Sequence, residues 1–220
     1  EAKPIVNTLF MAIGAVLASF MGTTGAAMLL IRAVIHTNKE RSFKVHTILF
    51  FIAIVANCGG MLTPLGDPPL FMMYLRGAHF TWFMKLAPEW FITNLLLLIT
   101  YFFVDTYYHK KESKEALLAD RTSVKPIKIS GNLNFLWLIG VVLSVAFING
   151  QYFKFIELNP SFKFIREAVI LAMAILSLLF TTKLVRSSNN FTWEPIKEVA
   201  YLFLGIFITM VPCLLYLEIN

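Results

Sequence analysis

The sequence predicts an all-α, polytopic integral membrane protein. Hydrophobic residues make up 58% of its 220 residues, charged residues make up only 15%, and phenylalanine occurs 21 times. A soluble protein of this length needs a far more polar surface. The apolar residues are gathered into long stretches, and a helix needs about 20 such residues to cross a bilayer. Charged connections separate these stretches.

The first apolar stretch, 5–35, is too long for one straight span. The sequence GTTG at 22–25 interrupts it, and the second arm, 26–35, is too short to cross a bilayer alone. We therefore expect a re-entrant helical hairpin with its tip near Thr23 and Thr24. Small residues are also common where membrane helices pack against one another, so the tip alone would not indicate a site.

The second apolar stretch, 45–75, is interrupted by the sequence ANCGGMLTPLGDPPLF at 56–71. Glycine weakens a helix, and proline removes a backbone donor and clashes with the preceding turn. We therefore expect a broken transmembrane helix whose first half ends near Asn57. The residues that we expect to shape the break are Gly59, Gly60, Pro64, Gly66, Pro68 and Pro69.

Asp67 lies inside this break. Pro68 biases Asp67 toward an extended backbone, and proline is well tolerated in the first turn of a helix, so Asp67 should be the N-cap of a second half-helix. A carboxylate in non-helical chain at membrane depth indicates a functional site. The carbonyl end of the first half-helix suits a small cation. We predict a sodium or proton site formed by Asp67, Asn57 and Thr63. The alternative is that Asp67 only caps a helix and the prolines only shape a kink.

Loop charges predict the orientation. We place the remaining spans at 87–104, 134–149 and 167–182, with a further membrane segment at 199–217. Lysine and arginine collect in cytoplasmic loops. The connections on one side carry twelve of these residues and those on the other side carry five. We therefore expect the cytoplasmic loops of a cell (inner) membrane protein at 36–46, 105–133 and 183–198. Loop lysines and arginines also explain the net charge of +6 without a nucleic-acid partner.

Three segments together resemble one family. The sequence at 56–71 resembles the broken-helix signature of the ion-transporter superfamily, which includes NhaD-type sodium:proton antiporters, citrate and dicarboxylate carriers, and arsenite permeases. FMGTTGAAMLLIRAVI at 20–35 resembles the first hairpin tip of that superfamily. NNFTWEPIKEVAYLFLGIFITMVP at 189–212 resembles the segment that opens its second half. The sequence is most similar to the sodium:proton antiporter branch.

The resemblance implies two inverted repeats, each of which contributes a hairpin and a broken helix to a midplane site. Only the first pair is visible, so the chain looks like roughly the first half to two thirds of a transporter. It divides into a first-repeat transport segment at 1–106 (hairpin 5–35, broken helix 45–75 and span 87–104), a cytoplasmic loop at 107–133, two connecting spans with their loops at 134–198, and the start of the second repeat at 199–220. The family's site positions correspond to Thr23, Thr24, Asn57, Gly60, Thr63, Pro64 and Asp67. No cofactor is implied beyond the transported ions, and relatives of this architecture are often homodimers.

The function implied by the resemblance is exchange of sodium for protons by competition at Asp67. The alternative is a cation-coupled citrate or dicarboxylate transporter on the same architecture. A fixed negative charge at Asp67 would repel a polycarboxylate, and the equivalent position in such carriers looks neutral, which favours the antiporter. Glu198 is the deepest of the acids near predicted helix starts, and we single it out as a candidate proton-pathway residue.

Other function classes fit the sequence less well. An intramembrane enzyme needs a nucleophile with a base, or metal ligands, at depth. The chain has no HExxH motif, no GxSxG motif and no paired membrane aspartates, so we expect no enzyme. All four histidines, His36, His46, His79 and His109, lie at span ends or in loops, where an interfacial role is expected. A structural membrane subunit and an uncoupled channel remain as further alternatives.

Overall fold

The structure is a computed structural model, and it describes residues 1–122, 130–148, 152–153, 162, 164–188 and 191–219. All the regular secondary structure in these residues is helical. Within the described residues, four helical stretches are long and apolar enough to span a membrane, namely Pro4–Met21, Val45–Leu62, Phe80–His109 and Glu194–Pro212. The predicted class, an all-α polytopic membrane protein, is confirmed. The chain forms two compact units, Glu1–Thr181 and Thr182–Asn220.

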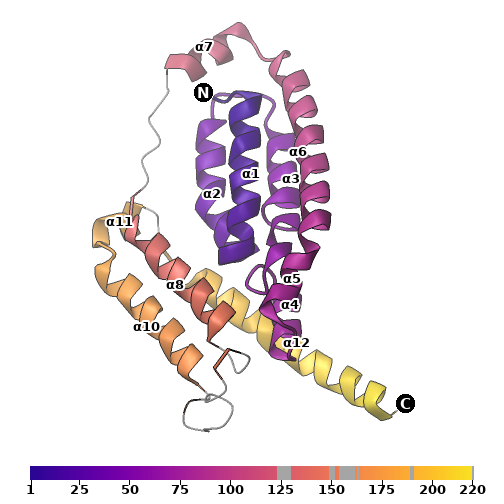
Figure 1. Ribbon diagram of the computed structural model, residues 1–220. Coiled ribbons are helices and arrows are strands. Elements are labelled where there is room, and N and C mark those ends of the chain that lie inside the picture. The colour runs from indigo at the N-terminus through magenta and orange to yellow at the C-terminus, as the bar shows by residue number, and fades with distance from the viewer. Residues whose placement is uncertain (123–129, 149–151, 154–161, 163, 189–190, 220) are drawn as a thin grey trace. The chain divides into compact units, whose positions relative to one another are not determined.

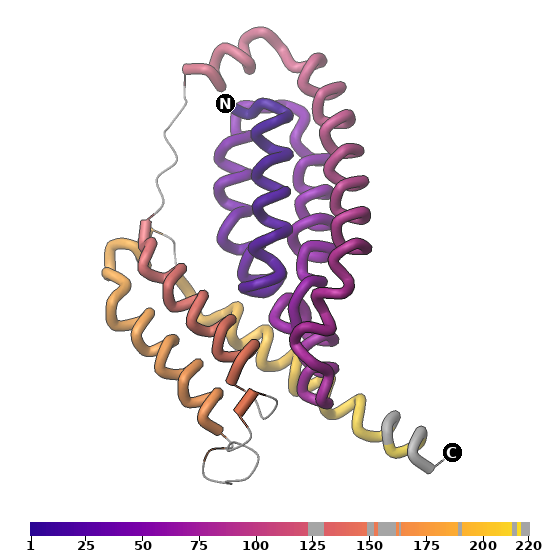
Figure 2. Tube along the Cα trace, viewed as in Figure 1, coloured from indigo at the N-terminus to yellow at the C-terminus, as the bar shows by residue number. Residues whose placement is uncertain are grey.

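The first unit begins with a helical hairpin. Helices α1 (Pro4–Met21) and α2 (Thr23–Thr37) are joined by Gly22 alone, whose φ of 83° is a conformation that favours glycine. The two helices lie side by side in Figures 1 and 2. The 15 residues of α2 extend about 22 Å, which is less than the hydrocarbon thickness of about 30 Å. The second arm is therefore too short to cross a bilayer by itself.

The next segment is a helix in three pieces. Helix α3 (Val45–Ile54) is followed by the 3-10 helix η1 (Cys58–Leu62) and then by helix α4 (Pro68–Leu75). The α-helix ends three residues before Asn57, somewhat earlier than the sequence suggested. Gly59 packs directly on α1, where a Cβ atom on Gly59 would lie 2.8 Å from Ala15 Cα.

A long helix closes the bundle. Helix α5 (Phe80–Phe83) and the 3-10 helix η2 (Met84–Leu86) lead into α6 (Ala87–His109), and α7 (Lys114–Thr122) follows. Helix α6 packs against α1, α3 and η1. The core between α1, α2, α3 and α6 contains Met11, Ala15, Ala18, Ala26, Val34, Phe51, Ile54, Val55 and Tyr101.

Two further helices complete the first unit. Helices α8 (Leu133–Phe147) and α10 (Ile165–Phe180) pack on one another, and the hydroxyls of Ser177 and Thr181 both donate to Asn134 Oδ1, at 2.7 and 2.9 Å. The Tyr74 hydroxyl of α4 donates to the Val145 carbonyl of α8 at 2.8 Å.

The second unit contains α11 (Lys183–Ser188) and α12 (Glu194–Ile219). Helix α12 continues through Pro212 and includes the predicted membrane segment 199–217. Glu198 lies in its second turn and is exposed within this unit.

Candidate ion-binding site

The hairpin tip and the break in the second apolar stretch meet. The Thr23 backbone N–H donates to the Gly66 carbonyl at 3.0 Å, and Thr23 is buried. A Cβ atom on Gly60 would lie 2.6 Å from Thr23 Cγ2. Two segments more than 35 residues apart, which were singled out independently as breaks in helical pattern, are therefore in contact.

Two glycines allow the broken segment to fold back on itself. A Cβ atom on Gly66 would lie 1.7 Å from the Gly60 carbonyl oxygen, and one on Gly60 would lie 2.9 Å from the Gly66 carbonyl oxygen. Neither position has room for a side chain. The close approach of these two backbone segments fixes the position at which Asp67, the residue after Gly66, leaves the turn.

Ser19 on α1 holds the turn in place, and it is not one of the residues predicted from the sequence. Its hydroxyl donates to the Gly59 carbonyl and accepts from the Leu62 N–H at 3.3 Å. The Thr63 hydroxyl donates to the Ser19 carbonyl and accepts from the Leu65 N–H at 3.2 Å. Thr63, which is only 2% exposed, thus uses its hydroxyl to hold the turn on α1. The available signal was a serine in an apolar helix one turn before the tip.

Two side chains of α6 donate hydrogen bonds to backbone carbonyl oxygens that were expected to face an ion. The Trp90 indole N–H donates to the Gly59 carbonyl at 2.9 Å, and the Asn94 amide donates to the Cys58 carbonyl at 3.4 Å. Asn94 is buried, and its Oδ1 has no hydrogen-bond partner among the described residues, so it is a free oxygen beside the break.

Asp67 occupies the N-cap position of α4 with an extended backbone, φ −148° and ψ 144°. Its carbonyl accepts from the Phe71 N–H at 3.1 Å, but its carboxylate makes no capping hydrogen bond. The side chain is half-buried, and within the described part of the chain it forms no ion pair. The carboxylate stands at the N-terminal end of a helix, where the helix dipole favours negative charge.

The remaining predicted residues separate into two groups. Pro64 is buried in the turn, and Pro68 and Pro69 form the first turn of α4. Asn57 and Thr24 are exposed within the described chain.

No group of three or more His, Cys, Asp or Glu residues in the described chain is arranged to hold a metal ion. A cation at the break would therefore be held by one carboxylate and neutral oxygens, the ligand type that hard cations prefer.

The comparisons with known proteins agree with this architecture. A family model described as putative citrate transport matches the chain over residues 1–220. No curated protein and no solved structure gave a match. The matched family is one of membrane transporters, which fits the membrane-spanning helices and gives no support to an enzyme. The chain therefore belongs to this citrate-transport family of the ion-transporter superfamily.

Proposed function

We propose that this chain carries one half of the ion site of a secondary active transporter, and that the site exchanges sodium for protons at Asp67. One observation carries the proposal, namely a half-buried carboxylate that has neither a capping bond nor an ion pair among the described residues and stands where a helix is broken. A carboxylate at the bilayer centre costs about 2.5–3.5 kcal/mol on insertion scales. A bound cation or proton offsets that cost, whereas a merely structural acid would be expected to have a protein partner.

The surrounding turn supports ion binding because it is held rigidly. The Thr23–Gly66 hydrogen bond joins the tip to the residue before Asp67, and Ser19 ties both sides of the turn to α1. A site held in this way loses little freedom when an ion binds. Asn94 Oδ1 supplies a buried oxygen with no partner in the described chain, and we assign it as a neutral candidate ligand on α6.

Competition between sodium ions and protons for one carboxylate couples the movement of sodium to the movement of protons. Asp67 holds either a sodium ion or a proton, so each reorientation of the site carries one species in exchange for the other. Binding of sodium should therefore weaken as the proton concentration rises, by up to about tenfold in apparent affinity for each tenfold rise in proton concentration. Glu198 on α12 is the second candidate for the proton route.

The second candidate function is cation-coupled transport of citrate or a dicarboxylate, which the family description favours. In that case Asp67 would hold the coupling cation, whose charge would reduce the repulsion between the carboxylate and an anionic substrate. Both functions use the same residues at the break, so the transported species has to be measured.

The test uses the full-length protein in proteoliposomes. Sodium-dependent proton movement is followed with a pH-sensitive dye, and uptake of labelled citrate is measured in parallel. Asp67→Asn should abolish sodium-dependent proton movement. Glu89→Gln is the matched control, because Glu89 is an exposed acid in the first turn of α6, and it should retain the activity. Exchange that survives Asp67→Asn would remove Asp67 from the mechanism, and sodium-driven citrate uptake without sodium–proton exchange would favour the carrier.

We also place the connections 36–46 and 105–133 on the cytoplasmic side. Backbone N–H groups of Ser42 and Phe43 donate to Glu112, so the two connections meet at one end of the bundle. Both are rich in lysine and arginine, as cytoplasmic loops are.

A further inference from the structure

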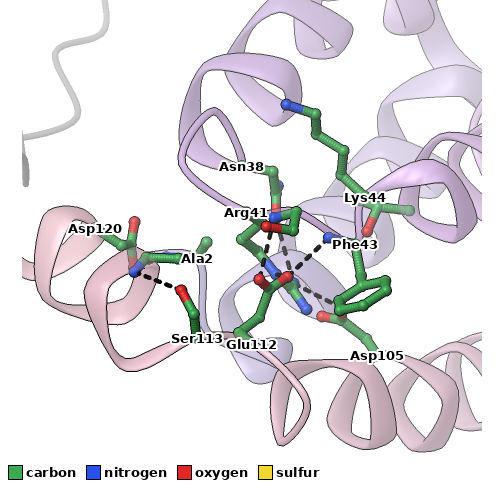
Figure 3. Close-up of polar contacts among 12 residues, drawn as sticks. Ala2, Asn38, Arg41, Phe43, Lys44, Asp105, Glu112, Ser113 and Asp120 are labelled. Carbon is green, nitrogen blue, oxygen red and sulfur yellow. Dashed lines mark hydrogen bonds and ion pairs between the residues drawn. The ribbon is translucent and has the colours of Figure 1, made fainter.

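A buried cluster of charged and polar side chains lies at the end of the first unit away from the hairpin tip, and Figure 3 shows part of this cluster. Along α6, Asp105 is 11 residues beyond Asn94, which corresponds to about 16 Å. We call this cluster the clasp and define it by Asn7, Asn38, Arg41, His46, Asp105 and Glu112. The proposed ion site contains none of these residues, and the clasp lies outside it.

The clasp is centred on Asp105, whose side chain is 0% exposed. Its Oδ1 accepts from Arg41 Nη1 at 2.7 Å and from His46 Nε2 at 2.8 Å. Its Oδ2 accepts from Asn7 Nδ2 at 3.3 Å, and Asn7 and Asn38 exchange two side-chain hydrogen bonds of 2.8 and 2.9 Å. Residues from α1, α3, α6 and the α2–α3 connection therefore converge on one carboxylate.

Glu112 fastens the α2–α3 connection from the other side. Its carboxylate, also 0% exposed, accepts from the backbone N–H groups of Ser42 at 3.1 Å and Phe43 at 2.9 Å. Arg41 approaches it less closely, with Nε 3.6 Å from Oε1. Bonds from backbone N–H groups stabilise the ionised carboxylate. Glu112 thus holds the connection against the end of α6.

The permanent charges of the clasp do not balance. Asp105 and Glu112 carry two negative charges, and Arg41, whose side chain is 3% exposed, carries one positive charge. Lys44 does not supply the second, since it is exposed and its ammonium donates to the Lys39 carbonyl. A buried unpaired charge is expensive. One further positive charge would balance the cluster.

His46 is placed to carry that charge. Its Nε2 already bonds to Asp105, and its ring stacks on Tyr108 with 4.7 Å between centroids, an arrangement in which a cation is favoured. Tyr101 is the other aromatic group that faces the ring, at 6.1 Å. His46 keeps 12% of its side chain exposed, while Asp105 is fully enclosed, so a proton can reach the imidazole from solvent.

We propose that the clasp is a second proton-binding site, in which an imidazolium at His46 balances the buried acids and holds the α2–α3 connection on α6. A protonated His46 favours the clasped form, so proton binding and the clasp stabilise one another, and the clasp becomes less stable as the pH rises. Histidine is the side chain that ordinarily titrates between about pH 5 and 8. At acidic pH the clasp would hold the C-terminal end of α2 and the N-terminal end of α3 in place, and at higher pH it would release them.

Hydrogen exchange measures the clasp directly and needs no transport, so it can fail or succeed independently of the Asp67 proposal. The intact protein in lipid nanodiscs is exchanged at several values between about pH 5 and 8. Protection is the amide-exchange rate of the unfolded chain divided by the rate of peptides covering 38–46 at the same pH. Protection should fall by about tenfold from the acidic to the alkaline end.

Variants separate the proposal from a clasp that is only structural. His46→Gln cannot carry a charge, so protection should be low and independent of pH. Asp105→Asn keeps an oxygen for Arg41 and His46 but removes the charge imbalance, so protection should also be independent of pH. His36→Gln, an exposed histidine on α2, should behave as wild type. Flat protection in wild type, or a wild-type response in His46→Gln, would overturn the proposal. If His46→Gln does not fold, a wild-type response in Asp105→Asn overturns it.

Discussion

Replacing Gly66 by alanine tests the idea that close backbone contact positions Asp67. The new Cβ atom would lie 1.7 Å from the Gly60 carbonyl oxygen, whereas close C···O contacts begin at about 3.3 Å. The backbone segments around Gly60 and Gly66 must therefore separate by roughly 1.5 Å. That movement breaks the hydrogen bond from the Thr23 N–H to the Gly66 carbonyl and shifts Asp67, the following residue.

The expected cost has two parts. Overpacking costs about 1–3 kcal/mol, and loss of one hydrogen bond costs about 0.5–1.5 kcal/mol. A total of about 2–4 kcal/mol lowers the melting temperature by roughly 5–15 °C for a domain of this size. A displacement of about 1 Å in a functional site can also lower its activity by about 100-fold. Gly66→Ala should therefore lose both stability and transport.

Thermal unfolding of the purified protein, followed by tryptophan fluorescence, gives the stability change. Gly25→Ala is the matched control, because the nearest atom to its new Cβ would be Met21 Cγ at an ordinary 3.7 Å and alanine favours a helix. The control should be at least as stable as wild type. If Gly66→Ala has the same melting temperature and transport activity as Gly25→Ala, the contact between the Gly60 and Gly66 segments does not position the site.

Two further substitutions test the hydrogen bonds that hold the break. Ser19→Ala removes the hydroxyl shared by the Gly59 carbonyl and the Leu62 N–H, and it should cost about 1–3 kcal/mol in thermal unfolding. The Ser144 hydroxyl donates to the Gly140 carbonyl of its own helix, so Ser144→Ala should cost less, and equal losses would argue against the role of Ser19. Trp90→Phe removes the indole donor to the Gly59 carbonyl and should cost about 0.5–1.5 kcal/mol and speed amide exchange in η1. Unchanged exchange there would show that α6 does not hold the turn.

Local sequence signals were sufficient to predict the all-α class and the break. Glycine and proline act on their own backbone, so the interruption between α3 and α4 could be located within a few residues. The contact between the tip and the break depends on how two helices pack, and only the family resemblance suggested it. The ligand set at Asp67 remains a prediction.

The partners contributed by α6 could not be predicted from the sequence in the same way. Trp90 and Asn94 reach the Gly59 and Cys58 carbonyls because of the register of α6 against η1, which no local pattern encodes. The clasp was missed for a related reason, since its ion pairs join residues up to 71 positions apart in the chain. Asp105 and Glu112 are seven residues apart, about two helical turns, and this spacing at the end of an apolar span was the available signal.

Helix α1 contributes residues to both ends of the first unit, namely to the turn that leads to Asp67 and to the clasp. Its outer face is a ridge of exposed residues, Ile5, Leu9, Ile13, Val16 and Phe20, which suits contact with lipid. Its inner face is small at the centre, where a Cβ atom on Gly14 would lie 2.6 Å from Val55 Cγ2 and Ala15 meets the backbone of Gly59. Larger residues there would push η1 outward and carry the Gly59 carbonyl beyond reach of Ser19. Small residues at the centre of α1 thus set the depth of the turn that leads to Asp67, while Asn7 on the same inner face fixes the clasp.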